Sequence, residues 1–278
     1  MEKSVLYNYK FPVISHRIGG LLYPENTLLG FQCHPKAVEF DVILTKDLVP
    51  IVFHDENTSR LIPAAGDRNI SDVNYDELKD FNLGLTYEQP SDLEQRKYDF
   101  TTNIPLFTDV LSYAYDKNIF MNIEIKPSTG HETITSEVIG REVLKFYNEK
   151  TPLDKHTPLF SSFSYESLLA IKRVCPDIPR AYLISNLDKC DWRDQLKKLE
   201  AVAVHTNYKH LTKGFIIYLS NLHIIKLIMW IYPELSDAVR AEGFGLFCYT
   251  INSVEIASDL TANYGVHAFC TDRIDLFT

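Results

Sequence analysis

The chain has 278 residues, of which 45% are hydrophobic and 23% are charged, as in an ordinary globular domain with a sizeable core. Its formal net charge of -9, without any clustering of lysine and arginine, argues against a nucleic-acid partner. The five cysteines have no metal-binding spacing and the N-terminus lacks a signal-peptide core, so we expect reduced thiols and a cytoplasmic location.

Short apolar runs alternate with longer amphipathic segments, a pattern typical of parallel strands joined by helices. Eight predicted strands cover residues 13–17, 38–42, 120–126, 159–163, 180–184, 201–205, 245–250 and 266–271. A shorter run at 50–54 follows the second strand closely. Helical periodicity is clearest at 107–118, 132–148, 165–174 and 253–263. We expect Ser164 and Asn252 to cap the last two of these helices.

This alternation predicts an α/β fold, a TIM-type (β/α)8 barrel that forms a single domain over residues 1–278. Residues 56–103 do not alternate, because they are polar and carry several prolines and glycines. We predict that they form a small inserted subdomain after the second strand, folded over one end of the barrel. Whether this insertion selects the substrate or only packs is left open by the sequence.

The apolar segment 215–232 is the second exception to the alternation. Asn221, His223 and Lys226 interrupt it, and a membrane-spanning helix needs about 20 mostly apolar residues. We therefore expect part of it to form a helix that packs on the barrel or on another subunit. The alternative is a flap that contacts a membrane or a lysolipid. The oligomeric state is left open.

Several predicted strands end on side chains that can do chemistry, at the barrel end where active sites of this fold lie. His16 and Arg17 end the first strand, and His54 ends the short run that follows the second. Glu39 and Asp41 lie on the second strand and point the same way, because side chains alternate along a strand. A charged group inside a strand is costly unless it is paired, which makes these positions unusual.

Glu124 and Lys126 end the third predicted strand and complete a set of three carboxylates at one barrel end. Such a set suits a hard divalent cation with oxygen ligands. One imidazole could take a proton from an attacking hydroxyl while another protonates the leaving alkoxide, and Arg17 offers a fork for phosphate oxygens. Each residue alone has a plainer structural explanation, but their joint occurrence on consecutive strands predicts phosphodiester cleavage.

The other histidines fall mostly in predicted helices or loops, where a packed or solvated role is the expectation. These are His34, His131, His156, His210 and His223. His205 ends a predicted strand and is a weaker candidate for lining the barrel mouth.

The candidate residues lie in ordered sequence motifs. The motifs are His16-Arg17 with Pro24-Glu25-Asn26-Thr27, Glu39-x-Asp41 with His54-Asp55, Glu124-x-Lys126, Ser162-Phe163, Tyr249-Thr250-Ile251-Asn252 and Thr271-Asp272-Arg273. Together they resemble the motifs of the glycerophosphodiester phosphodiesterase family, over nearly the whole chain and in the same order. The first two blocks are highly specific, whereas the Ser-Phe pair carries little information by itself.

The resemblance implies hydrolysis of glycerophosphodiesters to an alcohol and glycerol phosphate. It implies that His16 and His54 are the catalytic acid/base pair. It also implies that Glu39, Asp41 and Glu124 hold one divalent cation, Mg²⁺ or Ca²⁺.

The same resemblance implies a substrate and phosphate site around the catalytic pair. Arg17 and Lys126 would bind phosphate, while Glu25 and Asn26 would shape or line the pocket. Tyr249 stands where the family usually has tryptophan, which keeps an aromatic wall of different width.

Some positions depart from the family pattern and put the choice of substrate in question. Ile18 and Leu48 stand where glycine is usual, and His267 replaces a usual aspartate. So few residues separate Thr27 from Glu39 that the first helix should be short or absent. Two alternatives therefore stay open: a lipid-directed enzyme of the lysophospholipase D or sphingomyelinase D kind, and a non-catalytic phosphate-binding barrel.

Overall fold

The computed structural model describes residues 12–93, 100–150, 157–185, 191–211, 214–216, 228–230 and 233–277. Nine strands form one sheet, and all but β3 (Pro50–Val52) are parallel to their neighbours. The sheet closes because β1 pairs with both β2 and β11. The barrel strands are β1 (Val13–Ser15), β2 (Ala37–Leu44), β4 (Phe120–Ile125), β5 (Leu159–Ser162), β6 (Arg180–Ile184), β7 (Ala203–Asn207), β10 (Gly245–Tyr249) and β11 (Ala268–Thr271). The predicted TIM-type barrel is confirmed.

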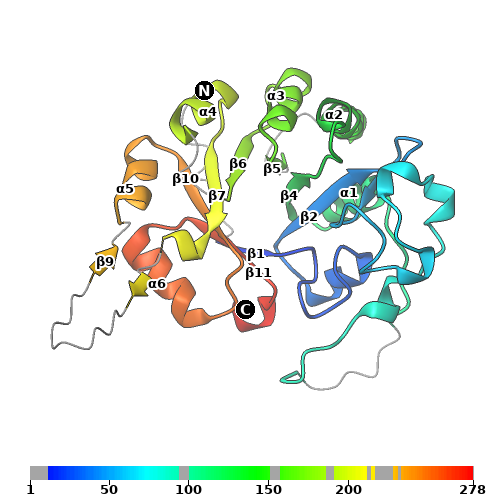
Figure 1. Ribbon diagram of the computed structural model, residues 1–278, viewed down its shortest axis with the longest axis horizontal. Coiled ribbons are helices and arrows are strands. Elements are labelled where there is room, and N and C mark those ends of the chain that lie inside the picture. The colour runs from blue at the N-terminus through cyan, green and yellow to red at the C-terminus, as the bar shows by residue number, and fades with distance from the viewer. Residues whose placement is uncertain are drawn as a thin grey trace.

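Helices cover the outside of the barrel (Figure 1). They are α1 (Phe107–Asp116), α2 (Glu132–Lys150), α3 (Tyr165–Val174), α4 (Trp192–Leu199), α5 (Pro233–Ala241) and α6 (Val254–Tyr264). Ser164 caps α3 as predicted, because its side chain accepts from the Ser167 N–H. The predicted cap of α6 is wrong by one residue: Ser253 accepts from the Ile256 N–H, while Asn252 bonds to the end of β11. No helix among the described residues is long and apolar enough to cross a membrane.

The barrel interior combines four alanines with larger side chains such as Leu159 and Phe247. Its apolar cluster includes Ala37, Ala181, Ala203 and Ala268, all buried and each on a different strand. Barrels of this fold usually fill their interior with bulky branched residues. Small side chains at this level leave room above them, toward the carboxyl ends of the strands.

The segment between Thr27 and β2 contains a 3₁₀ helix, Leu28–Cys33, and no α-helix. This agrees with the expectation that the first helix is short or absent. The larger core lies between the outer face of the strands and α1 to α6, where Phe40, Val42 and Ile123 pack against residues such as Phe107 and Leu168.

The described part of the predicted insertion folds beside β2 and β3 (Figure 1). It consists mainly of 3₁₀ turns, Pro63–Ala65, Ile70–Asp72, Tyr75–Glu77 and Leu83–Thr86. The last residues of β2 run on to pair antiparallel with β3, and Ile43 and Ile51 pack with Ile70 and Leu78 in a separate apolar cluster. Residues 94–99 lie outside the described part of the chain.

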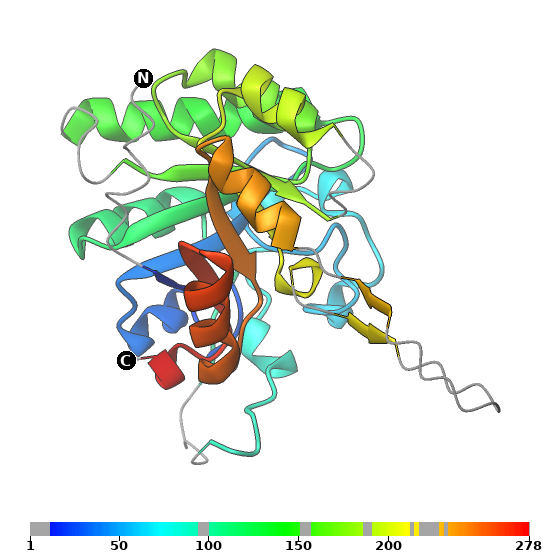
Figure 2. The same ribbon diagram turned by 90° about the vertical axis from the view of Figure 1, so that its left-hand side faces the viewer.

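Both described ends of the apolar segment 215–232 are strands, so the helix predicted for part of this segment does not include them. β8 (Gly214–Ile216) and β9 (Ile228–Trp230) pair as antiparallel strands, which project from the barrel in Figure 2. Apolar density alone does not separate a strand from a buried helix, and Ile, Phe and Trp favour strands. Residues 217–227 and 231–232, and with them the predicted lipid-facing flap, lie outside the described residues.

Candidate active site

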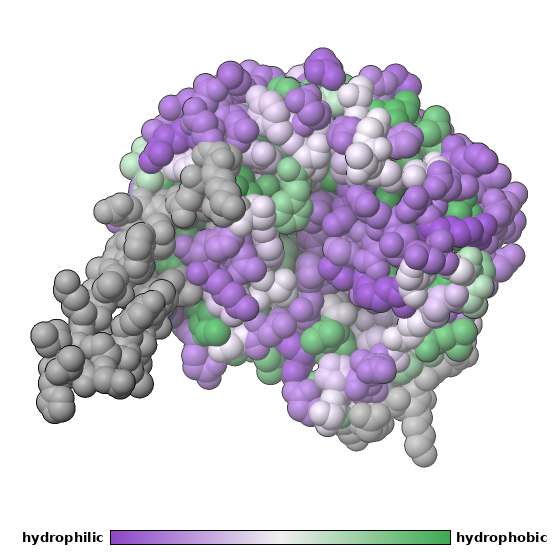
Figure 3. Space-filling model, viewed as in Figure 1, coloured by the Kyte–Doolittle hydropathy of each residue, from purple (hydrophilic) through white to green (hydrophobic). Residues whose placement is uncertain are grey.

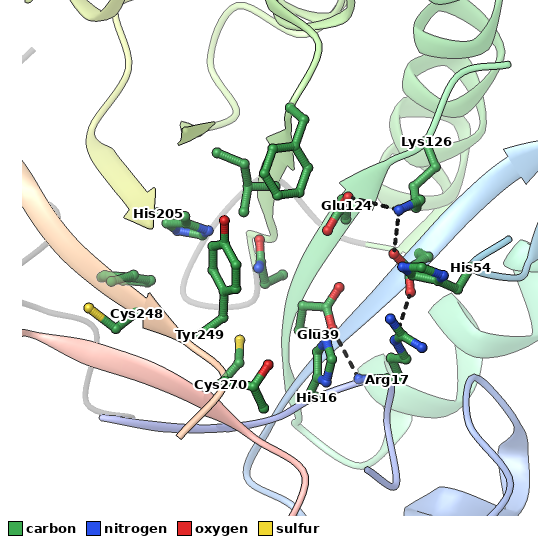
Figure 4. A pocket seen from close by; sticks show the side chains of 16 residues that line it. His16, Arg17, Glu39, His54, Glu124, Lys126, His205, Cys248, Tyr249 and Cys270 are labelled. Carbon is green, nitrogen blue, oxygen red and sulfur yellow. Dashed lines mark hydrogen bonds and ion pairs between the residues drawn. The ribbon is translucent and has the colours of Figure 1, made fainter. Parts of the chain in front are cut away.

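A cavity of about 210 Å³ opens at the carboxyl ends of the barrel strands, in a face that Figure 3 shows to be mostly hydrophilic. The predicted site residues that line it are His16, Arg17, Glu39, Asp41, His54, Glu124, Lys126 and Tyr249. Figure 4 shows the charged side chains of this set on one side and Tyr249 with His205 on the other. Residues that lie on or directly after β1, β2, β4, β7 and β10 thus meet in one cavity, although the sequence separates them widely.

Three buried carboxylates form the acidic centre of the cavity. β2 and β4 pair with Asp41 opposite Glu124, and Glu39 lies two residues before Asp41 on the same face. One oxygen from each of the three carboxylates lies within 4.8 Å of the others. Burial and the charge of Asp41 raise the pKa of Glu39 to about 7 and that of Glu124 to about 8.

Basic groups balance only part of this negative charge. The Lys126 ammonium lies 3.7 Å from Asp41 and 3.5 Å from Glu124. Burial opposes ionisation of Asp41, but Lys126, His54 and Arg17 hold its pKa below the usual value. The Oε1 atom of Glu39 is buried and has no hydrogen-bond partner among the described residues. Oxygen donors this close together, one of them unpaired, fit a hard divalent cation.

His16 is held at the edge of the acidic centre by a carboxylate from the other end of the chain. Its Nδ1 atom lies 2.6 Å from Oδ1 of Asp272, and its Nε2 atom lies 3.8 Å from Oε2 of Glu39. Burial opposes protonation, but Asp272 and Glu39 together raise the pKa of His16. Asn252 fixes Asp272 in turn, since its Oδ1 accepts the Asp272 N–H at 2.8 Å and its Nδ2 donates to Asp272 Oδ2 at 3.2 Å.

His54 has a carboxylate partner of its own, because its Nδ1 atom lies 2.7 Å from Oδ1 of Asp55. Arg60 donates to Asp55 through Nε at 2.7 Å and to Glu25 through Nη1 at 2.7 Å. Arg17 donates to the same Glu25 carboxylate at 2.8 Å. An unbroken chain of charged contacts therefore links His54 to Arg17.

Two predicted pocket residues lie behind the cavity and do not line it. Glu25 contacts Arg17 and Arg60, and Asn26 donates from Nδ2 to Oδ2 of Asp41 at 2.9 Å. Both hold a residue that does line the cavity. Gly20 has a similar supporting place, since a Cβ there would lie 2.4 Å from the carbonyl oxygen of Asp272.

The sequence prediction missed three residues that hold the site together. Asp55 and Asp272 stand in the recognised motifs but received no role, and Arg60 was not singled out. Asp272 directly follows the last barrel strand, which is the signal that could have found it. Arg60 lies in a polar segment where no local pattern marks it.

Comparison with known proteins identifies the family. The profile of the glycerophosphoryl diester phosphodiesterase family matches residues 16–276. The chain belongs to this family. It is therefore a phosphoric diester hydrolase with glycerophosphodiester phosphodiesterase activity, and the alternative of a non-catalytic barrel is set aside.

Several members of the glycerophosphodiesterase family resemble the chain over most of its length. A glycerophosphodiester phosphodiesterase of Bacillus altitudinis is 31% identical over 203 residues, 71% of this chain and 76% of the relative. The solved structure of an Oleispira antarctica phosphodiesterase in complex with the product sn-glycerol-3-phosphate is similar at a TM-score of 0.73 and 26% identity, covering 96% of this chain and 95% of the other. The human lysophospholipase D GDPD1 is 27% identical over 263 residues, 86% of this chain and 76% of the relative.

The two departures from the family's glycines fall at unusual backbone conformations. Ile18 has φ 66° and Leu48 has φ 61°, in the left-handed region that favours glycine. Arg17 and Asn26 are also left-handed, at 49° and 55°. Residues in this region persist where the surrounding structure holds them, and such strain often gathers at functional sites.

The position where the family usually has tryptophan keeps its aromatic character in the glycerophosphodiesterase cavity. Tyr249 at the end of β10 packs edge-on against Phe163, with ring centroids 6.0 Å apart. Phe163 is 44% exposed, so the two rings form an apolar wall at the mouth of the cavity.

The described histidines outside the predicted pair divide as follows. His34, His131, His210 and His267 do not line the cavity, whereas His205 does. His156 and His223 lie outside the described residues. The cysteines Cys33, Cys175, Cys248 and Cys270 are unbridged.

Proposed function

We propose that the chain hydrolyses glycerophosphodiesters to an alcohol and glycerol phosphate with a divalent cation and with His16 and His54 as general acid and base. The observation that carries this proposal is one juxtaposition. Two histidines, each hydrogen-bonded to its own carboxylate, line the same cavity as three clustered acidic groups.

Glu39, Asp41 and Glu124 would hold the cation, which we propose to be Mg²⁺ or Ca²⁺ because all three donors are carboxylate oxygens. When bound, the cation supplies a positive charge that neutralises and orients the phosphate. The raised pKa values of Glu39 and Glu124 support this assignment, since they reflect negative charge that the described residues leave only partly balanced.

Proton transfer falls to the two histidines. One imidazole takes the proton of the nucleophile, which is either water or the glycerol 2-hydroxyl of the substrate, and the other protonates the departing alkoxide. Asp272 and Asp55 hold the Nδ1 atoms of His16 and His54, which leaves each Nε2 atom for this work. An imidazole has a pKa near enough to neutrality for either role.

Arg17 and Lys126 are the basic side chains in the cavity suited to phosphate oxygens. Each already lies beside an acidic group, Arg17 at 2.8 Å from Glu25 and Lys126 at 3.7 Å from Asp41. These contacts hold the guanidinium of Arg17 and the ammonium of Lys126 on the side of the cavity that carries the acidic centre. Tyr249 forms the opposite wall.

A lysophospholipid is the second candidate substrate. Phe163 and Tyr249 give the mouth of the cavity an apolar wall, and one similar human protein carries the name lysophospholipase D. The volume of about 210 Å³ favours the smaller diester, because sites for drug-sized molecules are typically about 300–1,000 Å³.

The test is a steady-state assay on glycerophosphocholine and on lysophosphatidylcholine, each with Mg²⁺, with Ca²⁺ and with a chelator. We expect metal-dependent release of choline, with glycerol phosphate as the second product from glycerophosphocholine, and a higher kcat/KM for glycerophosphocholine than for lysophosphatidylcholine. The matched variant Glu39→Gln should lose both the activity and the response to metal. Full activity in the chelator would refute the cation, and a preference for lysophosphatidylcholine would establish the second candidate.

A further inference from the structure

The imidazole of His205 enters the cavity from β7 with a polar atom that no described residue satisfies. His205 is 3% exposed, and its ring stacks on Phe247 with centroids 4.8 Å apart and planes 10° from parallel. Leu183 lies opposite His205 on β6, and Phe247 lies opposite it on β10. Its Nε2 atom is buried and has no hydrogen-bond partner among the described residues.

Asn122 carries a further unsatisfied atom in the lining of the same cavity, besides those of Glu39 and His205. It is 1% exposed and lies on β4 two residues before Glu124, so its side chain shares the inward face of the strand. Its Oδ1 atom is buried and likewise has no partner within the described part of the chain. Buried polar atoms are nearly always hydrogen-bonded in folded proteins, so two orphans in one cavity indicate a polar ligand.

The chemistry of these two groups restricts the ligand to an uncharged one. Burial alone lowers the pKa of His205 to about 3, so its imidazole is neutral at physiological pH. A neutral imidazole offers one N–H donor and one nitrogen acceptor, and an amide oxygen only accepts. A hydroxyl group can both donate and accept, so it suits these partners, whereas an ammonium or a phosphate group lacks an opposite charge at His205.

The proposed phosphate ligands of the cavity lie away from His205. Figure 4 shows Lys126 and Arg17, and with them His54, on the side opposite His205. A glycerophosphodiester has the same division, because its phosphate is anionic and its glyceryl group carries only hydroxyls.

We propose that His205, with Asn122, determines specificity by binding the hydroxyl groups of the glyceryl part of the substrate. The inference rests on the proposed function, since it takes the phosphate to lie beside Arg17 and Lys126. His205 selects the substrate and takes no part in proton transfer. Diesters without glyceryl hydroxyls lose these contacts.

The test compares wild type with His205→Leu, which removes the polar atoms, and with His205→Gln, which restores one. Calorimetry with sn-glycerol-3-phosphate and with inorganic phosphate, both in Mg²⁺, separates the glyceryl contacts from the phosphate contacts. We expect His205→Leu to weaken the binding of glycerol phosphate by about 3- to 10-fold, as for loss of one neutral hydrogen bond. The affinity for inorganic phosphate should stay unchanged. His205→Gln should recover part of the loss.

Two further measurements keep a structural role apart from a binding role. Replacing an unpaired buried polar group by an apolar one should leave Tm unchanged or raise it, while a purely structural histidine would lower it. His131→Leu, the same substitution at an exposed histidine outside the cavity, is the control and should change neither affinity. Equal effects of His205→Leu on both ligands, or none, would overturn the inference. Wild-type protein that fails to hydrolyse glycerophosphocholine would instead refute the proposed function.

Discussion

Arg60 pairs with Glu25 through two hydrogen bonds of 2.7 and 2.8 Å, although 35 residues separate them in the sequence. The same guanidinium donates twice to Asp55, at 2.7 and 2.8 Å. Glu25 also accepts a hydrogen bond from Arg17. Asp55 is likewise hydrogen-bonded to His54. A residue of the predicted insertion thus ties the loop that carries a proposed catalytic histidine to the loop that carries a proposed phosphate ligand.

The change Arg60→Met should therefore reduce activity more than stability. Partners that orient a site typically contribute about 10- to 100-fold, so we expect kcat/KM for glycerophosphocholine to fall by about that factor. The side chain of Arg60 is about half exposed, and surface ion pairs add little to folding, so Tm should hardly move. Arg68→Met removes a comparable exposed pair with Glu77 and is the control. Wild-type kcat/KM in Arg60→Met would show that this network does not position the site.

Asp272→Asn should impair His16 without disturbing the proposed cation site. An amide at this position cannot stabilise a protonated imidazole, so kcat should drop by about 10²- to 10⁴-fold. Because Asp272 helps to raise the pKa of His16, the limb of the pH–rate profile that belongs to His16 should move to lower pH. Asp275→Asn, which affects a pair with Arg273 outside the cavity, should keep the wild-type profile.

The two histidines should be separable by the choice of leaving group. His16→Ala and His54→Ala should each lower kcat on glycerophosphocholine by about 10²- to 10⁴-fold while metal binding persists. A phosphodiester with a p-nitrophenolate leaving group needs little protonation of that group. It should therefore restore kcat only in the variant that lacks the general acid. His131→Ala changes an exposed histidine outside the cavity and serves as the control. Near-full activity of either variant on the poor leaving group would mean that this histidine is structural.

Stability of the metal-free protein should fall as pH rises. Glu39 and Glu124 have pKa values of about 7 and about 8 in the folded chain against an ordinary value of 4.5, so the folded state binds more protons between these limits. The stability that this protonation contributes is fully present below pH 4.5. It is lost as the pH rises through the folded-state pKa values of about 7 and about 8. The pKa of His16 is also raised, which acts in the same direction.

Calorimetric Tm values from about pH 5 to about pH 9, with a chelator and with saturating Mg²⁺, measure this effect. We expect Tm in the chelator to decline above about pH 6.5, because the lowered pKa of His205 acts in the opposite direction only below its ordinary value of 6.5. The gain from Mg²⁺ should grow with pH because the cation binds the ionised carboxylates. The double variant Glu39→Gln, Glu124→Gln should show neither trend. A metal-free Tm that rises with pH would contradict the assignment.

The sequence alone determined the barrel and the inward residues of its strands. Alternation of short apolar runs with amphipathic segments is a local property, and the strand period of two puts Glu39 and Asp41 on one face wherever the strand lies. His16 and Glu124 both stand at the carboxyl ends of predicted strands, where active sites of this fold lie, so their placement at the same barrel end could also be predicted.

Only the tertiary structure decided what holds these residues and how deep the cavity runs. Asp272 reaches His16 across 256 residues because closure of the barrel sets β11 beside β1, and no local pattern encodes that pairing. Arg60 meets Glu25 only after the insertion folds against β2 and β3, and the segment at 215–232 pairs as strands at its described ends where its composition suggested a helix. Periodicity is a property of the backbone and can be read residue by residue, whereas these contacts depend on which distant surfaces close on one another.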